Sequence, residues 1–336
     1  MLNCALVGYG YWGPNIARSM IRIKNVNLSI ICDKDKIKLA SARLLYPQIL
    51  STDNFDLVLK NPKIDAVIIA TPASTHFDLA SKILKSGKHI LIEKPITTNT
   101  KEAQNLIEIN MKAKKIAMVG HTFEYNPTVL KMKKIINEDS FGKVYYIYST
   151  RVNLGQIRGD VNALWNLAPH DVSILNFLLG ENPEEVMAIG ASFLQKKIED
   201  VVFLMLKYPN NVLAEVHLSW LDPAKERKVT VVGSKKMLVF DDLDNEMPLK
   251  IYDKRADTGE IARGLSTEYK IKLHSGDIYA PQIESKEPLL EELIHFFECI
   301  EKNKQPITDL ENGLNVVRVL QAAQQSLKGN SKWVKV

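Results

Sequence analysis

The sequence predicts a two-part α/β protein, in which a doubly wound parallel sheet is followed by an α+β domain with a predominantly antiparallel, open sheet. Three observations support this fold class. The chain has 336 residues, more than one hydrophobic core usually spans. Residues 3–120 alternate short apolar runs with amphipathic segments, and this rhythm changes after residue 121. We therefore expect domains at 1–121 and 122–336.

The first half contains five short apolar runs separated by four segments with helical periodicity. Continuous apolar runs are typical of strands that are buried on both faces, so helices should cover both sides of the sheet. The expected strands lie at 3–10, 28–33, 65–72, 89–95 and 115–121, and the expected helices at 14–23, 36–45, 76–87 and 100–113.

The second half reads as an antiparallel sheet with helices on one side. Two hairpins are expected, at 201–220 with a turn at residues 209–211 and at 228–242 with a turn around Gly233. Further elements are expected at 127–137 (helix), 143–154 (strand) and 168–180 (helix), followed by helices at 289–303 and 310–327. The last two helices are expected to pack on one domain or the other.

The composition excludes several classes of protein. An apolar fraction of 46% with 25% charged residues is ordinary for a globular chain. The net charge of +5 is spread out, and the densest basic patch, 131–139, also contains acids, so no nucleic-acid partner is indicated. The longest apolar runs are too short to span a membrane, and no signal peptide is evident. The three cysteines have no metal or disulfide spacing. We expect a cytoplasmic protein without a metal site.

A glycine-rich loop follows the first strand. Gly8, Gly10 and Gly13 form G-x-G-x-x-G around Tyr11 and Trp12, with Pro14 at the expected first helical position. Such glycines let a pyrophosphate approach the backbone at the positive end of a helix. The loop therefore predicts a dinucleotide site in a Rossmann sheet.

An acid at the end of the second strand refines this prediction. Asp33 can hydrogen-bond a ribose 2′-hydroxyl and would repel a 2′-phosphate, which favours NAD over NADP. Two alternatives stay open. Asp33 caps a helix that starts near Asp35, and the glycines only make a tight turn. Alternatively, Lys34 or Lys36 meets a 2′-phosphate.

Polar residues also end the next two strands, where ligands bind in open α/β sheets. Residues 71–76 read T-P-A-S-T-H and residues 93–95 read E-K-P. We expect these endings to line the cofactor crevice through Thr71, Pro72, His76, Glu93 and Lys94. In this order, with G-x-G-x-x-G before them, the motifs resemble the Gfo/Idh/MocA family of NAD(P)-dependent sugar and polyol oxidoreductases. The resemblance covers essentially the whole chain, and E-K-P is its most specific part.

The resemblance implies that Lys94 lies between nicotinamide and substrate and hydrogen-bonds the reacting hydroxyl. An ammonium group there would steady alkoxide character as a hydride leaves. The alternative is a lysine that extends its charged end from a strand terminus into solvent. A cis peptide bond before Pro95 that aims Lys94 is a further hypothesis.

For the second half, the resemblance implies an Asp and, four residues later, a His that exchanges the hydroxyl proton. His170 matches the histidine, but Asn166 occupies the Asp position. An amide cannot take a proton, so His170 acts without that carboxylate or Asp171 partly substitutes. Residues 166 and 170 share a face only in a continuous helix, and Pro169 disfavours helical geometry just before it. His170 as a plain helix-start residue is the alternative.

The same stretch supplies candidate substrate contacts. Sugars are held by hydrogen bonds and an aromatic face, and arginine grips phosphate, which suits a nucleotide-linked sugar. The candidates are Tyr125, Asn153, Arg158, Asn162, Trp165 and Arg227.

These observations predict an NAD-dependent sugar oxidoreductase in which Lys94 positions the oxygen and His170 moves the proton. An NADPH-dependent ketosugar reductase of deoxysugar biosynthesis is the alternative within the fold. A non-catalytic dinucleotide-binding sensor is the alternative from another class, suggested by Asn166. The resemblance also implies a homo-oligomer, dimer or tetramer, formed through the open sheet face.

Overall fold

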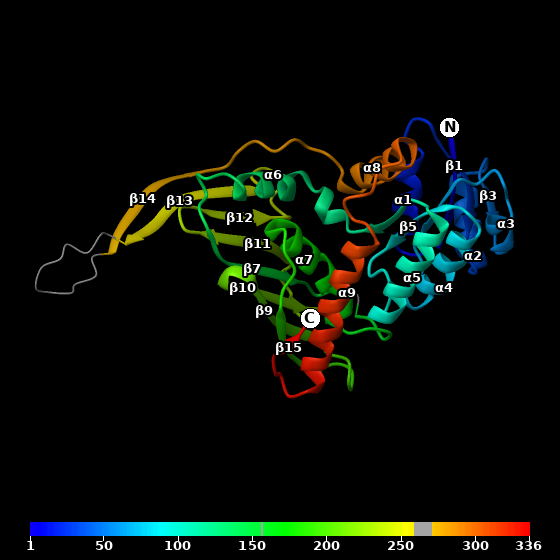
Figure 1. The fold of residues 1–336 in the computed structure, drawn as a ribbon. Coiled ribbons are helices and arrows are strands. Elements are labelled where there is room, and N and C mark those ends of the chain that lie inside the picture. The colour runs from blue at the N-terminus through cyan, green and yellow to red at the C-terminus, as the bar shows by residue number, and fades with distance from the viewer. Residues whose placement is uncertain (156, 259–270) are drawn as a thin grey trace, which may run out of the picture. The chain divides into compact units, whose positions relative to one another are not determined.

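A computed structural model describes residues 1–155, 157–258 and 271–336. The chain divides into two compact units: Met1–Tyr125 with Lys286–Gln321, and Asn126–Ser285 with Ala322–Val336. The sequence left open which domain the last two helices join, and the segment Lys286–Gln321 belongs to the first unit. Both units are drawn in Figure 1.

The first unit contains a six-stranded parallel sheet in the order β3-β2-β1-β4-β5-β6. The strand order reverses between β1 and β4, so right-handed crossovers put helices on both faces, as predicted. The strands are β1 (Leu2–Val7), β2 (Val26–Cys32), β3 (Leu50–Thr52), β4 (Ala66–Ile69), β5 (His89–Glu93) and β6 (Ala117–Gly120).

The helices of this unit form two layers. Helices α4 and α5 pack on each other, whereas α1 packs against α8, which comes from the far end of the sequence. The elements are α1 (Gly13–Met20), α2 (Lys36–Leu45), α3 (Asp56–Leu59), η1 (Ala73–Thr75), α4 (His76–Lys85), α5 (Thr100–Ala113), η2 (Thr122–Tyr125), α8 (Pro288–Lys302) and α9 (Leu310–Lys328), the last of which continues into the second unit.

Helix α8 completes the core of the first unit. Its apolar residues Leu289, Leu293, Phe296 and Phe297 join the buried cluster built by β1, β2 and α1. Three-and-four spacing brings them to one face of the helix. Periodicity predicts this apolar face but does not identify the surface that it covers.

The second unit contains a nine-stranded sheet in the order β14-β13-β12-β11-β7-β10-β9-β8-β15. All neighbours are antiparallel except β7 and β10, which confirms the predicted mostly antiparallel sheet. The strands are β7 (Val144–Val152), β8 (Glu185–Ala191), β9 (Val201–Tyr208), β10 (Val212–Ser219), β11 (Glu226–Gly233), β12 (Met237–Asp241), β13 (Leu249–Thr258), β14 (Ile271–Tyr279) and β15 (Val334–Lys335).

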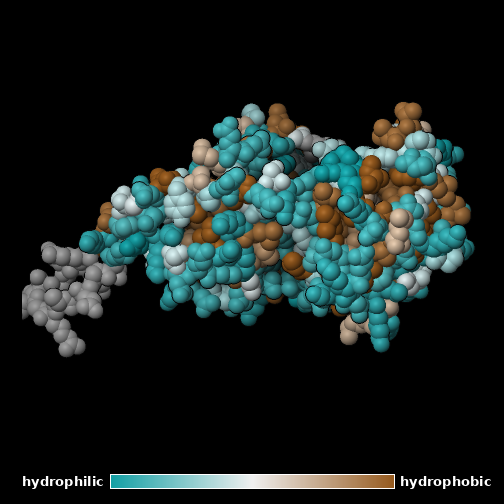
Figure 2. Space-filling model, turned by 90° about the horizontal axis from the view of Figure 1, so that it is seen from above, coloured by the Kyte–Doolittle hydropathy of each residue, from teal (hydrophilic) through white to brown (hydrophobic). Residues whose placement is uncertain are grey.

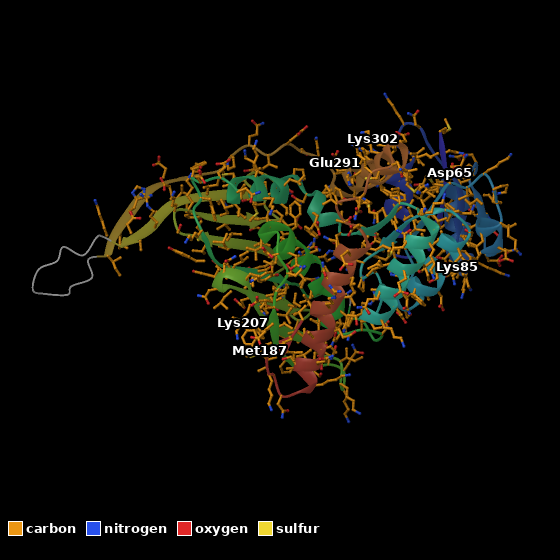
Figure 3. The ribbon with its side chains drawn as sticks, in the orientation of Figure 1. Asp65, Lys85, Met187, Lys207, Glu291 and Lys302 are labelled. Carbon is orange, nitrogen blue, oxygen red and sulfur yellow. The ribbon has the colours of Figure 1, made fainter. Side chains whose placement is uncertain are left out.

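One face of this sheet is covered by helices α6 (Pro127–Ile136) and α7 (Ala163–Leu179). A short 3-10 turn, η3 (Pro209–Asn211), joins β9 to β10 at the predicted turn. On the opposite face, side chains from six neighbouring strands lie in one paired row, namely Leu213, Tyr146, Val232, Met237, Tyr252 and Ile278. Met187 and Lys207, labelled in Figure 3, alternate with buried residues on β8 and β9.

The row is an extended apolar band rather than a set of isolated side chains. Leu213, Tyr146 and Ile278 are 42%, 46% and 52% exposed. By contrast, the surface seen in Figure 2 is mostly hydrophilic, with separate groups of hydrophobic residues. A contiguous apolar band on one sheet face is typical of an interaction surface.

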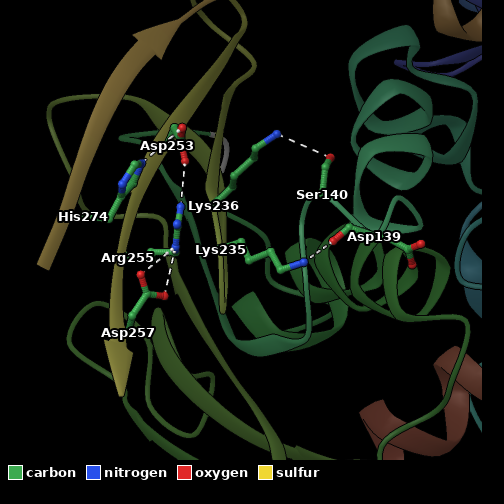
Figure 4. Close-up of polar contacts among 8 residues, drawn as sticks. All are labelled: Asp139, Ser140, Lys235, Lys236, Asp253, Arg255, Asp257 and His274. Carbon is green, nitrogen blue, oxygen red and sulfur yellow. Dashed lines mark hydrogen bonds and ion pairs between the residues drawn. The ribbon is translucent and has the colours of Figure 1, made fainter. Parts of the chain in front are cut away.

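The paired strands β13 and β14 have a line of charged residues on one side. Arg255 contacts Asp257 at 3.0 Å and Asp253 at 3.5 Å, and His274, paired with Arg255, lies 3.4 Å from Asp253 (Figure 4). Such exposed pairs each contribute little to stability. At the turn between β11 and β12, Lys235 donates to the carbonyl of Asp139 at 2.8 Å, which fixes this turn to the segment before β7.

Candidate functional site

The glycine loop packs tightly on the neighbouring strand end. Gly8 has φ +98°, and a Cβ there would collide with the carbonyl of Ala70 and approach the nitrogen of Thr71 to 2.9 Å. A Cβ on Gly13 would lie 2.6 Å from the carbonyl oxygen of Gly8. Both positions therefore require glycine, one for its backbone conformation and both for close packing.

Gly10 differs because it faces open space. A Cβ there would meet only the Lys38 ammonium, 4.0 Å away. The adjacent helix α1 begins after Trp12, which makes no side-chain cap, and its first turn contains no acid. Unsatisfied backbone N–H groups at this positive helix end suit an anion. The loop therefore fits a pyrophosphate, while the Tyr11 side chain is 87% exposed.

Asp33 connects the second strand to this loop. Its Oδ2 accepts from the Tyr9 backbone N–H at 2.6 Å, and its Oδ1 accepts from Asp35 N–H at 2.8 Å. Helix α2 is capped by Asp35, which accepts from Ile37 and Lys38. The alternative in which Asp33 caps this helix is therefore wrong. The carboxylate lies at the carboxyl end of β2, beside the glycine loop.

His76 holds two predicted cofactor segments together. Its Nδ1 lies 2.9 Å from the Pro95 carbonyl oxygen and its Nε2 lies 2.8 Å from the Thr71 carbonyl oxygen. The ring is 1% exposed, and burial lowers its pKa. The ring thus lies between the backbone carbonyls of two predicted cofactor segments, and the direct cofactor contact predicted for His76 stays a prediction. Thr71 bonds Thr75, and Pro72, which is exposed, precedes η1.

The E-K-P segment lies where β5 ends. Lys94 donates its backbone N–H to Glu93 Oε2 at 3.2 Å, and the Lys94–Pro95 bond is cis, as hypothesised. Burial raises the pKa of Glu93 to about 7, although the Lys94 charge opposes this shift. Because β4 and β5 are adjacent, Lys94 lies at the same sheet edge as the glycine loop.

In the second unit, Asn166 and His170 lie on one continuous helix. Helix α7 runs from Ala163 to Leu179 through Pro169 without a break. Residues four apart therefore share a face, which removes the geometric objection raised by the proline. The Asn166 Oδ1 accepts from the Trp220 indole N–H at 3.2 Å.

Asp171 faces the sheet. Its Oδ2 lies 2.5 Å from Arg151 Nε, and its Oδ1 accepts from Ser149 Oγ at 2.6 Å. The side chain is 1% exposed. Both oxygens are committed to β7, so the structure gives no support for Asp171 as a substitute for the carboxylate missing at 166.

Several candidate substrate residues make structural contacts. Asn162 caps α7, and its amide donates to Glu199 at 2.6 Å and to Gln324 at 3.0 Å. The Trp165 indole donates to the same Gln324 oxygen at 3.1 Å. Sequence reasoning could not see this link, because Gln324 lies about one hundred and sixty residues away.

The other candidates differ in their surroundings. Tyr125 is 6% exposed, and its hydroxyl lies 3.2 Å from Thr308 Oγ1, so its position indicates a core role. Arg158 pairs with Asp160 at 2.8 Å. Partly exposed Arg227 pairs with Asp242 at 3.2 Å. Asn153, also partly exposed, donates its backbone N–H to Ser219.

The structure also reveals a buried polar cluster in the first unit. His121, Glu124 and Glu292 are each 1% exposed, and Thr122 Oγ1 donates to Glu292 Oε2 at 3.0 Å. Burial lowers the pKa of His121 to about 3 and raises that of Glu124 to about 8. The one sequence signal was an acid on the apolar face of α8, between Leu289 and Leu293.

Comparison with known proteins agrees with this geometry. Residues 2–121 match the model of an oxidoreductase family with an NAD-binding Rossmann fold, and residues 133–336 match the C-terminal alpha/beta domain of that family. None of the described helices has the length and apolar character of a membrane span.

Two characterised relatives illustrate the match. The UDP-N-acetylglucosamine 3-dehydrogenase of Acidithiobacillus ferrooxidans is 28% identical over 223 residues, which cover 66% of this chain and 69% of the relative. Its solved structure superposes with a TM-score of 0.81, at 22% identity and 98% coverage of both chains. The scyllo-inositol 2-dehydrogenase (NAD(+)) of Bacillus subtilis is 26% identical over 330 residues, 94% of this chain and 91% of the relative. With both family models matched along nearly its whole length, this chain belongs to the Gfo/Idh/MocA family of NAD-binding oxidoreductases.

Proposed function

We propose that this oxidoreductase is an NAD-dependent dehydrogenase that oxidises a secondary alcohol of a sugar or polyol, with a nucleotide-linked sugar as the preferred substrate class. The observation that carries the proposal is the shared sheet edge. The glycine loop, Asp33 and Lys94 all lie at the carboxyl ends of one parallel sheet, where doubly wound folds bind their ligands.

The chain's own residues have distinct tasks in this reaction. Bound NAD supplies the hydride acceptor. Lys94 donates a hydrogen bond to the substrate oxygen and stabilises its developing negative charge. His170 accepts the hydroxyl proton, for which the near-neutral pKa of an unperturbed imidazole is suited. The carbon loses a hydride and the oxygen loses a proton, which leaves a ketone.

Asn166 gives this chain an amide one turn before His170. Its oxygen accepts from Trp220, so its position on α7 is fixed. An amide hydrogen-bonds a substrate hydroxyl but does not stabilise an imidazolium by charge. His170 therefore carries the proton transfer without help from a carboxylate at position 166.

The substrate class rests on the relatives and on two arginines. One relative acts on UDP-N-acetylglucosamine and another on scyllo-inositol. Arg158 and Arg227 are both partly exposed on the second unit, each beside one acid. A phosphate could exchange with these carboxylates because surface pairs are weak. This favours a phosphate-bearing sugar over a free polyol.

The first experiment separates cofactor choice from turnover. NADH and NADPH are titrated by fluorescence, and the protein is then incubated with NAD and UDP-sugars, dTDP-sugars or inositols while NADH absorbance is followed. We expect tighter NADH binding and turnover on a nucleotide-sugar. Preferential NADPH binding would instead support the ketosugar reductase. Tight NADH binding without turnover across the panel would support the non-catalytic sensor.

Two variants test the assigned roles. Lys94→Ala and His170→Asn should each lower kcat by about 100-fold or more while NADH binding stays near that of the wild type. Lys85→Ala is the matched control, because Lys85 is an exposed lysine at the end of α4, labelled in Figure 3. If either active-site variant kept full kcat, its residue would have no part in the chemistry.

We also propose that the protein is a cytoplasmic homo-oligomer. All three cysteines are free and buried, which fits a reducing compartment. The apolar band on the open sheet face offers a self-complementary surface. Tyr146→Lys with Leu213→Glu should reduce the mass measured by light scattering, whereas Leu44→Glu, an exposed position in the first unit, should not. An unchanged mass in the double variant would exclude this face.

A further inference from the structure

Glu292 occupies a position where the helix pattern calls for an apolar residue. It lies on the buried face of α8, next to Leu293 and one turn before Phe296. Glu292 is 1% exposed, and Thr122 Oγ1 donates to its Oε2 at 3.0 Å. Its Oε1 is buried and has no hydrogen-bond partner among the described residues. A buried carboxyl group is costly, so its presence calls for a physical role.

The Glu93 carboxyl group reaches the same region from β5. Strands β5 and β6 pair Glu93 with Gly120, and a Cβ on Gly120 would lie 3.2 Å from Glu93 Oε2. Thr122, which binds Glu292, follows Gly120 by two residues. The Glu93 carboxyl group is buried beside the Trp12 indole, whose hydrogen bond partly opposes the rise in its pKa. The two carboxyl groups thus face one short segment, 120–122.

Electrostatics couple the two acids. Burial raises the pKa of Glu292 well above its ordinary value, and the negative charge of Glu93 raises it further. Burial also raises the pKa of Glu93, while the Lys94 charge lowers it. Two close carboxyl groups in a dry environment with one nearby cation do not both ionise.

We propose that Glu292 is a positioning residue for Lys94: Glu292 and Glu93 hold one proton between them, so the pair presents a single negative charge to the Lys94 ammonium. This inference rests on the proposed function, in which Lys94 contacts the substrate oxygen. Loss of the shared proton would add a second negative charge beside Lys94, and a second proton would remove the negative charge of the carboxyl pair.

The other titratable groups around Glu292 do not replace this arrangement. His121 is neutral because its pKa is lowered to about 3 by burial and then by Lys94. Glu124 stays protonated at neutral pH because burial raises its pKa to about 8. Arg18 on the neighbouring α1 and Arg22 just after it pair with Glu287. On α8 itself, burial lowers the pKa of His295.

The test compares three variants of α8. Glu292→Gln keeps the shape and the neutral state, Glu292→Ala removes the group, and Glu291→Gln is the control on the adjacent, partly exposed residue labelled in Figure 3. The first readout needs no substrate. In the infrared spectrum at pH 7, protonated Glu124 contributes a carboxyl band to the wild type and to every variant. The wild type and Glu291→Gln should show additional protonated-carboxyl absorption that Glu292→Gln lacks. An identical band in wild type and Glu292→Gln would overturn the shared proton.

The second readout addresses positioning. On whichever sugar the wild type turns over, Glu292→Ala should lower kcat at least about tenfold with NADH affinity within about twofold. Glu292→Gln should keep kcat within about threefold at pH 7 and change the alkaline limb of the pH profile. Wild-type kcat in Glu292→Ala would overturn the positioning role. If the wild type turns over no sugar, the proposed function fails, while the infrared result still decides the proton sharing.

Discussion

Replacing Asp171 with Asn should unfold the second unit at a markedly lower urea concentration. The Arg151 Nε lies 2.5 Å from Asp171 Oδ2, and the two side chains are 6% and 1% exposed. Removing the charge from one partner of a buried ion pair costs about 3–5 kcal/mol, because the other charge stays buried without its counter-ion. The Asn oxygen can still accept from Arg151 Nε while its amide donates to Ser149 Oγ, so the change removes the charge rather than both hydrogen bonds.

A double replacement distinguishes destabilisation by the unpaired charge from destabilisation by poorer packing. The double variant Arg151→Met with Asp171→Leu should recover most of the lost free energy of unfolding, because a well-packed apolar pair often stabilises a protein as much as a buried ion pair does. Ser149 keeps an acceptor in that variant, because its Oγ also lies 3.2 Å from the Lys228 carbonyl oxygen. We expect the double variant within about 2 kcal/mol of the wild type.

Urea unfolding followed by tryptophan fluorescence measures these differences. Three of the four tryptophans, Trp165, Trp220 and Trp333, belong to the second unit, so the signal reports mainly on it. Arg158→Met is the control, because the exposed Arg158–Asp160 pair should contribute at most about 1 kcal/mol. If Asp171→Asn lowered the free energy of unfolding by no more than Arg158→Met does, the reasoning would be refuted.

Three further outcomes are expected. Burial raises the pKa of Glu124 from 4.5 to about 8, so wild-type stability should fall as pH rises through that range. The free energy of unfolding of Glu124→Gln, measured by urea titration, should therefore rise relative to that of the wild type as pH rises. The relative increase should be on the order of 4 kcal/mol at pH 8. Asp33→Ser should weaken NADH binding and narrow its preference over NADPH in fluorescence titrations, because the repelling carboxylate is gone; an unchanged ratio would remove Asp33 from cofactor choice. Gly8→Ala should lower the thermal unfolding midpoint and weaken NADH binding, because the new Cβ would collide with the Ala70 carbonyl and because φ is +98° at this position. Wild-type values for both quantities would contradict the close packing of the loop.

Local features of the site were predictable because the sequence encodes them within a few residues. The glycine loop, the acid after β2 and the E-K-P turn follow from strand endings and backbone geometry alone. The continuous α7 was less certain, because Pro169 pointed toward a break that the surrounding helix overrides.

Long-range partners were not predictable. Nothing near Asn162 or Trp165 indicates that both bond Gln324, and nothing near Tyr125 indicates Thr308. Such contacts depend on which surfaces meet after folding, which periodicity does not report. For the same reason the sequence places Glu292 on the apolar face of its helix but does not reveal Thr122 as its partner.

Because α8 belongs to the first unit, the core of that unit is completed only late in synthesis of the chain. Leu289, Leu293, Phe296 and Phe297 fill a core whose other members lie between residues 4 and 125 and are therefore made earlier. Until the segment that begins at Lys286 has been made, that core lacks part of its filling. At about 5–20 residues per second, the ribosome needs roughly 8–32 s to make the intervening stretch of about 160 residues. The nascent first unit therefore carries exposed apolar surface for that interval, which makes it a natural client for chaperones.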